Sequence, residues 1–114
     1  MNEICQGNGI QFVVIMIPTK ESVFSRYIEH NSNISMSETN DQVIEKERIA
    51  RKTLHEYFAA SKIKFFDPLG KMEEAIDREK LYAASAVDMH PNKNGYRVIA
   101  EAVSGYLLTA DQVK

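Results

Sequence analysis

One segment limits the possible folds of this chain more than any other: the run Ile10–Ile17, IQFVVIMI, which is almost continuously apolar and rich in β-branched side chains. Such a run is typical of a strand in a parallel sheet whose two faces are both covered. Residues 1–8 look like the end of a helix, Gly9 suits a left-handed residue after it, and Pro18 ends the run. We therefore expect a buried strand over residues 10–17.

The rest of the chain alternates helical and extended patterns. Four segments have helical spacing of their apolar residues: 20–30, 42–61, 69–77 and 93 to about 109. Asn92 is placed to cap the last of these helices. A second short strand is expected at Ile63–Phe66, an extended segment at 81–85, and a polar surface loop at 31–41. Strands that alternate with helices predict an α/β fold with right-handed crossovers and a parallel sheet.

The overall composition excludes several classes of function. The chain has 114 residues, enough for one domain, and its 44% hydrophobic and 26% charged residues are typical of a soluble globular protein. A formal net charge of -2, with both signs mixed, gives no reason to expect nucleic acid or an anionic membrane as a partner. No apolar run approaches the roughly 20 residues of a membrane span, and no secretory signal is visible. We therefore expect no membrane span and, by default, a cytoplasmic chain.

The composition also argues against metal and cofactor sites. The single cysteine, Cys5, excludes a disulfide within the chain, and three histidines without further cysteines disfavour a metal site built from sequence neighbours. The Glu73-Glu74 pair has no histidine or cysteine beside it. No Gly-rich phosphate loop is present, which disfavours a flavodoxin-like ligand-binding domain. We expect neither a metal nor a cofactor.

The segment from Asp88 to Asn92, DMHPN, carries the clearest chemistry. An aspartate two residues before a histidine, just ahead of a helix, can orient the imidazole and stabilise its protonated form. The helix dipole lowers the pKa of such a histidine and the carboxylate raises it, which suits a general base near neutral pH. The alternative is a helix-entry loop in which Asp88 and Asn92 cap the helix and His90 is incidental.

Two runs of the sequence resemble a known family. DMHPNKNGYRVIAEAV resembles the last block of the SGNH/GDSL hydrolases, in which D-x-H-P-N or D-x-x-H-P-N precedes a glycine and an amphipathic helix. VVIMIPTKESVFSRYIE resembles a strand-to-helix segment of SGNH-like proteins, including those related to alginate O-acetylation. The resemblance implies that His90 is the general base and Asp88 its orienting acid. Many members place the aspartate three residues before the histidine, where this chain has Val87.

The same resemblance implies a fold, of which this chain would hold only the C-terminal part. It implies a flavodoxin-like three-layer α/β/α SGNH hydrolase fold with a parallel sheet, of which residues 1–114 form a single domain that corresponds to the C-terminal part. The family's nucleophilic serine, and the glycine and asparagine of its oxyanion hole, lie in earlier blocks, and no serine of this chain stands in a G-D-S context. The expected function is ester hydrolysis or O-acyl transfer. An ester or acylated carbohydrate would be a substrate only if an N-terminal half completed the site, and the chain alone is expected to be inactive.

A second interpretation is a non-catalytic α/β remnant that acts as a small oligomeric interaction module. Two strands are fewer than the four to six of a usual sheet, so an apolar edge is left uncovered. We expect a homo-oligomer, most simply two-fold, in which Ile10–Ile17 or its flanking helices meet a second copy. Among the remaining polar residues, Lys20 and Glu21 are expected to hold the loop at a helix start. His55 is expected to be a solvated surface residue, and His30 to end a helix.

Overall fold

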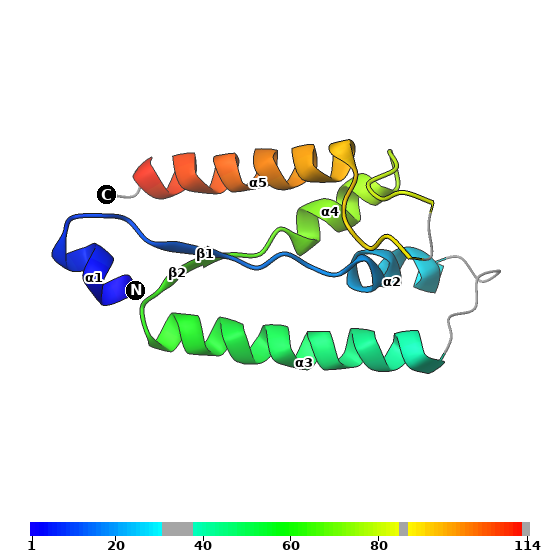
Figure 1. Ribbon diagram of the computed structural model, residues 1–114, viewed down its shortest axis with the longest axis horizontal. Coiled ribbons are helices and arrows are strands. Elements are labelled where there is room, and N and C mark those ends of the chain that lie inside the picture. Colours follow the sequence, from blue (N-terminus) through cyan, green and yellow to red (C-terminus); the bar gives the residue numbers. More distant parts are fainter. Residues whose placement is uncertain (31–37, 85–86, 113–114) are drawn as a thin grey trace.

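The computed structural model describes residues 1–30, 38–84 and 87–112, and its elements follow one another as helices and two short strands (Figure 1). The order along the chain is α1 (Asn2–Gly7), β1 (Val13–Ile15), α2 (Lys20–His30), α3 (Glu38–Ala60), β2 (Lys64–Phe66), α4 (Leu69–Ile76) and α5 (Lys93–Gln112).

β1 and β2 form a parallel two-stranded sheet, in which Val14 is opposite Phe65. Successive side chains of β2 point to opposite faces of the sheet, as the pleat requires. Phe65 packs on Phe58 of α3 at 5.5 Å between ring centroids, whereas Phe66 stacks on Tyr106 of α5 at 4.9 Å. Helices α3 and α5 therefore cover opposite sides of the strand pair, as Figure 1 shows. The predicted α/β character and the parallel pairing are confirmed.

β1 is shorter and less buried than its sequence predicts. Only Val13–Ile15 form the strand, because β2 offers just three partner residues, so the prediction of a strand over residues 10–17 is wrong at both ends. None of the three β1 residues is fully buried. Helices α3 and α5 lie on the two faces of the strand pair, as expected for a covered strand, but they leave all three residues partly exposed. A long apolar run stays extended here without the second neighbouring strand that would bury it.

The helices agree with the predicted pattern except at their ends. α3 begins at Glu38, so residues 38–41 of the predicted loop are helical, while residues 31–37 lie outside the described part. α4 ends one residue early and α5 runs past residue 109 to Gln112. In place of an extended segment over 81–85, Tyr82 makes one antiparallel bridge with Pro91, and residue 85 is not described. Gly9 has the predicted left-handed backbone after α1, with φ 68°.

The buried core lies away from the sheet, at the end of the molecule to which the C-terminal ends of both strands point (Figure 1). It joins α2, α4, α5 and the segment before α5, and consists of Val23, Met72, Ala75, Leu81, Tyr82, Val98 and Ile99. The molecule is elongated, with extents of 52 × 26 × 24 Å. Among the described helices, none is both long and apolar enough to cross a membrane.

Candidate functional site

The segment that carries Asp88 and His90 is fixed to the body of the protein by the first turn of α5. Asn92 caps the helix, since its Oδ1 accepts the Gly95 N–H at 3.0 Å, as predicted. The Asn92 side-chain amide donates to the Lys80 carbonyl at 3.0 Å, and its backbone N–H donates to the Leu81 carbonyl at 2.8 Å. Asn92 thus caps α5 and also hydrogen-bonds the loop before it to residues 80–81.

Gly95 allows this attachment because it has no side chain. A Cβ at position 95 would lie 2.7 Å from Pro91 Cβ and closer still to the Leu81 carbonyl oxygen. Real Cβ atoms do not approach other atoms so closely, so α5 could not pack at this distance with any other residue. The close approach of Gly95 therefore sets the position of Pro91, the residue next to His90.

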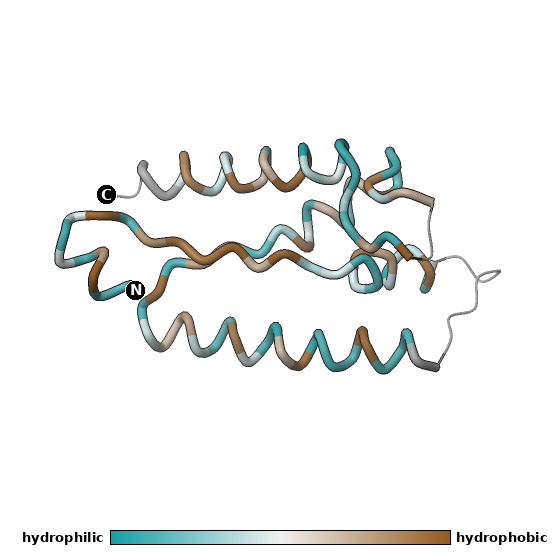
Figure 2. The backbone as a smooth tube through the Cα atoms, in the orientation of Figure 1, coloured by the Kyte–Doolittle hydropathy of each residue, from teal (hydrophilic) through white to brown (hydrophobic). Residues whose placement is uncertain are grey.

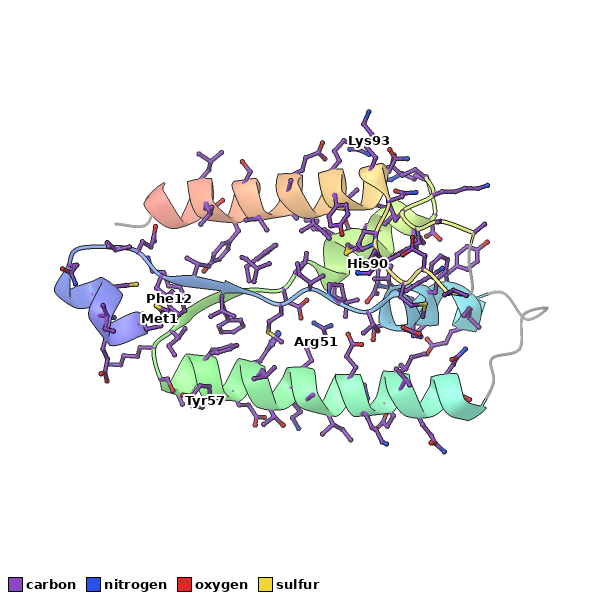
Figure 3. All side chains as sticks on the ribbon, viewed as in Figure 1. Met1, Phe12, Arg51, Tyr57, His90 and Lys93 are labelled. Atoms are coloured by element: carbon purple, nitrogen blue, oxygen red, sulfur yellow. The ribbon has the colours of Figure 1, made fainter. Side chains whose placement is uncertain are left out.

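Asp88 and His90 make the contact that the sequence predicts. His90 Nδ1 lies 3.1 Å from Asp88 Oδ1, and the same oxygen accepts the His90 backbone N–H at 3.0 Å. These two hydrogen bonds, the backbone one first, lower the pKa of Asp88 below its ordinary value, and Lys20 adds a smaller effect of the same sign. The carboxylate is therefore ionised at neutral pH and holds the imidazole through Nδ1. Figure 3 shows His90 beyond the strand ends, in the half of the molecule toward which both strands run.

The pair is open to solvent. The His90 side chain is 84% exposed and that of Asp88 54% exposed, so their contact by itself contributes little stability. With Nδ1 directed at Asp88, the imidazole nitrogen left to take up or release a proton is Nε2. Among the described residues no serine or threonine hydroxyl is hydrogen-bonded to His90. The structure thus brings an imidazole and a carboxylate together at the surface.

Lys20 connects this segment to the start of α2. Its Nζ donates to the Ala83 carbonyl at 3.1 Å and lies 5.8 Å from the centre of the Tyr82 ring. Lys20 stands at the start of α2, as predicted, but the segment that its Nζ contacts is 63 residues further along the chain and was not predicted. Beside Lys20, an open hollow of about 640 Å³ lies between α2, α4 and the segment before Asp88, with Phe24 and Tyr82 in its wall.

A second polar cluster, at the C-terminal ends of both strands, was not predicted. Arg51 of α3 bonds Glu47 at 2.6 Å and Asp67 at 2.8 Å, and all three side chains are largely buried. His55 Nε2 lies 3.1 Å from the same Asp67 oxygen, and its ring packs on Phe65 at 4.9 Å. His55 is 41% exposed, as expected for a surface residue, but it is also held by Asp67, which was not predicted. Figure 3 shows Arg51 between α3 and the strands.

This cluster joins α3 to the segments that leave β1 and β2. The hydroxyl and the backbone N–H of Thr19, after β1, both donate to Glu47. Burial alone would raise the pKa of Glu47, but hydrogen bonds from Thr19, Ser22 and Arg51 lower it below its ordinary value. Because the charges satisfy one another, the cluster is structural. Its sequence signal was the spacing of Glu47, Arg51 and His55, four residues apart on one helical face.

No metal-binding cluster accompanies these groups in the described part of the chain. Within residues 1–30, 38–84 and 87–112, no group of three or more histidine, cysteine, aspartate and glutamate side chains could hold a metal ion. Cys5 is a free, partly buried thiol. The side chain of His30 lies outside the described part of the chain. No family model, curated protein or solved structure matches this chain.

Proposed function

We propose that this chain is the acid–base part of an SGNH/GDSL-type ester hydrolase or O-acyl transferase, with His90 as general base and Asp88 as its orienting acid. One observation carries the proposal: Asp88 Oδ1 holds His90 Nδ1 at 3.1 Å. That arrangement is the one in which a carboxylate fixes the tautomer of a catalytic histidine and stabilises the imidazolium that forms during acyl transfer.

The surroundings of the pair support the same function. Both strands end toward His90, and parallel α/β sheets place their functional groups at the carboxyl ends of the strands. The helices on opposite sides of the strand pair support a flavodoxin-like SGNH arrangement as the finer fold. The hollow beside Lys20 is large enough for a sugar unit or a short acyl chain, in keeping with an ester or acylated-carbohydrate substrate.

Acyl transfer also needs a nucleophile and oxyanion-hole donors, and no motif of this sequence provides them. His90 can take a proton from a serine hydroxyl as it attacks an ester, and return it to the leaving alcohol. The serine and the oxyanion donors would come from another polypeptide segment. Without them the main sources of rate enhancement are absent, so the chain alone should not turn over p-nitrophenyl acetate. If the chain does turn over this ester and His90→Ala abolishes the activity, a serine within the chain acts as the nucleophile.

The proton on His90 provides the direct test. If Asp88 orients the ring for catalysis, neutral His90 carries its proton on Nδ1, and side-chain ¹⁵N NMR will show this. His55 is an internal comparison, because it meets its carboxylate through Nε2 and should carry its proton there. Asp88→Asn should remove the preference of His90 and leave His55 unchanged. A neutral His90 protonated on Nε2 in the wild type could not accept a proton there and would refute the proposal.

A second candidate is a non-catalytic α/β interaction module that forms homo-oligomers. The exposure of His90 and the absence of a hydroxyl partner among the described residues favour it. The DNA upstream of Met1 separates the two candidates. An in-frame G-D-S-type block would support the hydrolase, whereas a promoter directly before Met1 would support the module.

A further inference from the structure

The two edges of the sheet differ in what they offer a further strand. The Met16 N–H donates to the Phe66 carbonyl, so the backbone groups of Met16 face β2. Because backbone groups alternate in direction along a strand, those of Val13 and Ile15 face the opposite edge of β1. No strand of the described residues pairs with that edge. It therefore presents unpaired N–H and C=O groups, the usual template for pairing with another chain.

Charged side chains lie along the β2 edge of the sheet and are absent from β1. The β2 side carries Lys62 and Lys64, both exposed, and lysines on an edge strand oppose pairing. The run Ile10–Ile17 around β1 has no charged residue, and Figure 2 shows it as a nearly continuous hydrophobic stretch. A strand approaching β1 would meet no charge on that strand, whereas one approaching β2 would meet two lysines. The charged residues of the groove beside β1, Glu47 and Arg51, already pair with each other.

An apolar groove of about 560 Å³ runs beside β1, between the strand and α3. Its wall includes Ile17, which is 55% exposed, and Leu54, which is 41% exposed. Apolar side chains that line an open groove beside a free strand edge are typical of a surface that another element covers. The groove and the edge belong to one continuous surface, which we call the β1 face.

The chain exposes more surface than a folded monomer of its mass usually does. A folded monomer of 13.0 kDa exposes about 6,300 Å², whereas this chain exposes 8127 Å². The excess of about 1,800 Å² lies within the 1,000–2,500 Å² or so that each partner of an obligate dimer buries. The radius of gyration, 16.1 Å, likewise exceeds the roughly 13 Å of a compact domain of this length.

We propose that the β1 face is the interface of a homodimer, in which β1 pairs antiparallel with β1 of a second copy across a two-fold axis. A two-fold contact brings the same edge of both copies together, and an uncharged strand is self-complementary in that arrangement. The result is a four-stranded sheet of order β2-β1-β1-β2. Asp88 and His90 lie beyond the strand ends, so the dimer does not depend on their catalytic role. A segment that completed the hydrolase through β1 would displace the second copy.

Sedimentation equilibrium from 1 to 100 µM, together with Ile15→Pro, tests the dimer. Proline removes the Ile15 N–H, which faces the free edge, and leaves the Met16 bond to β2 intact. We expect twice the monomer mass for the wild type and a folded monomer for the variant, with helicity checked by circular dichroism. A wild type of 13.0 kDa throughout this range would overturn the proposal.

A matched pair of charge substitutions keeps the test valid if Ile15→Pro does not fold. Ile17 and Ile49 are 55% and 56% exposed, but only Ile17 lines the β1 face. Ile17→Lys should raise the dissociation constant about 100-fold, since it buries an unpaired charge. Ile49→Lys should leave it unchanged. An equal effect of both would place the interface elsewhere. His90→Ala should dimerise normally, so the dimer and the catalytic proposal can fail separately.

Discussion

Replacing Gly95 with alanine tests the packing that positions the Asp88–His90 segment. In an exposed helix position, this change would stabilise the protein by about 1 kcal/mol through helix propensity. Here the new Cβ would lie 2.7 Å from Pro91 Cβ and closer to the Leu81 carbonyl, so the helix and the segment must separate. Overpacking of this kind costs about 1–3 kcal/mol. Weakening the Asn92 N–H bond to Leu81 adds about 1 kcal/mol.

The net expectation for Gly95→Ala is a loss of about 1–3 kcal/mol in the free energy of unfolding, or roughly 5–15 °C in Tm. Urea denaturation at one fixed protein concentration measures it, since self-association also affects apparent stability. Gly105→Ala is the matched control, because it lies in the same helix with no atom within 4 Å of the added Cβ. It should gain up to about 1 kcal/mol. If Gly95→Ala instead gains stability as Gly105→Ala does, the close approach of α5 does not constrain the segment.

The other predictions concern buried polar groups. Arg51→Met should lose about 3 kcal/mol, because it removes the arginine that neutralises two largely buried carboxylates. Arg48→Met, whose partner is exposed, should change stability by less than about 1 kcal/mol, and equal losses would contradict a structural cluster. The pKa of Glu47 is lowered in the folded state, so its contribution is present at neutral pH and disappears as the pH falls below 4.5. Urea titrations of Glu47→Gln should show a flatter acid limb, and an unchanged slope would refute this. Burial raises the pKa of Tyr82 to about 12, and its hydroxyl has no hydrogen-bond partner among the described residues. Tyr82→Phe should therefore keep or gain stability, and it should remove a phenol that titrates near pH 12 in the absorbance at 295 nm. A clear loss of stability would instead reveal a partner for the hydroxyl.

The parts of this protein that could be predicted from sequence depend on contacts between near neighbours. Asp88 and His90 are two residues apart, so their hydrogen bond needs only a local turn. The Asn92 cap reaches three residues forward, and Gly9 ends α1 through its own backbone angle. Amphipathic spacing placed the helices because one face of each must be buried. The proposed roles of His90 and Asp88 rest on this local geometry and on the family resemblance.

Contacts between distant residues were decided by the tertiary structure alone. The Arg51–Asp67 pair spans 16 residues and the Lys20–Ala83 bond 63, and neither follows from any pattern along the chain. Apolar character identified β1 as a strand, but its length depends on how many residues β2 offers, and its burial on which helices pack against it. The hydrophobicity of a side chain sets the free energy that is gained when it is buried away from water. Whether Val23 or Val14 is buried depends on the packing of whole elements, which placed the core between α2, α4 and α5 and left the β1 face open.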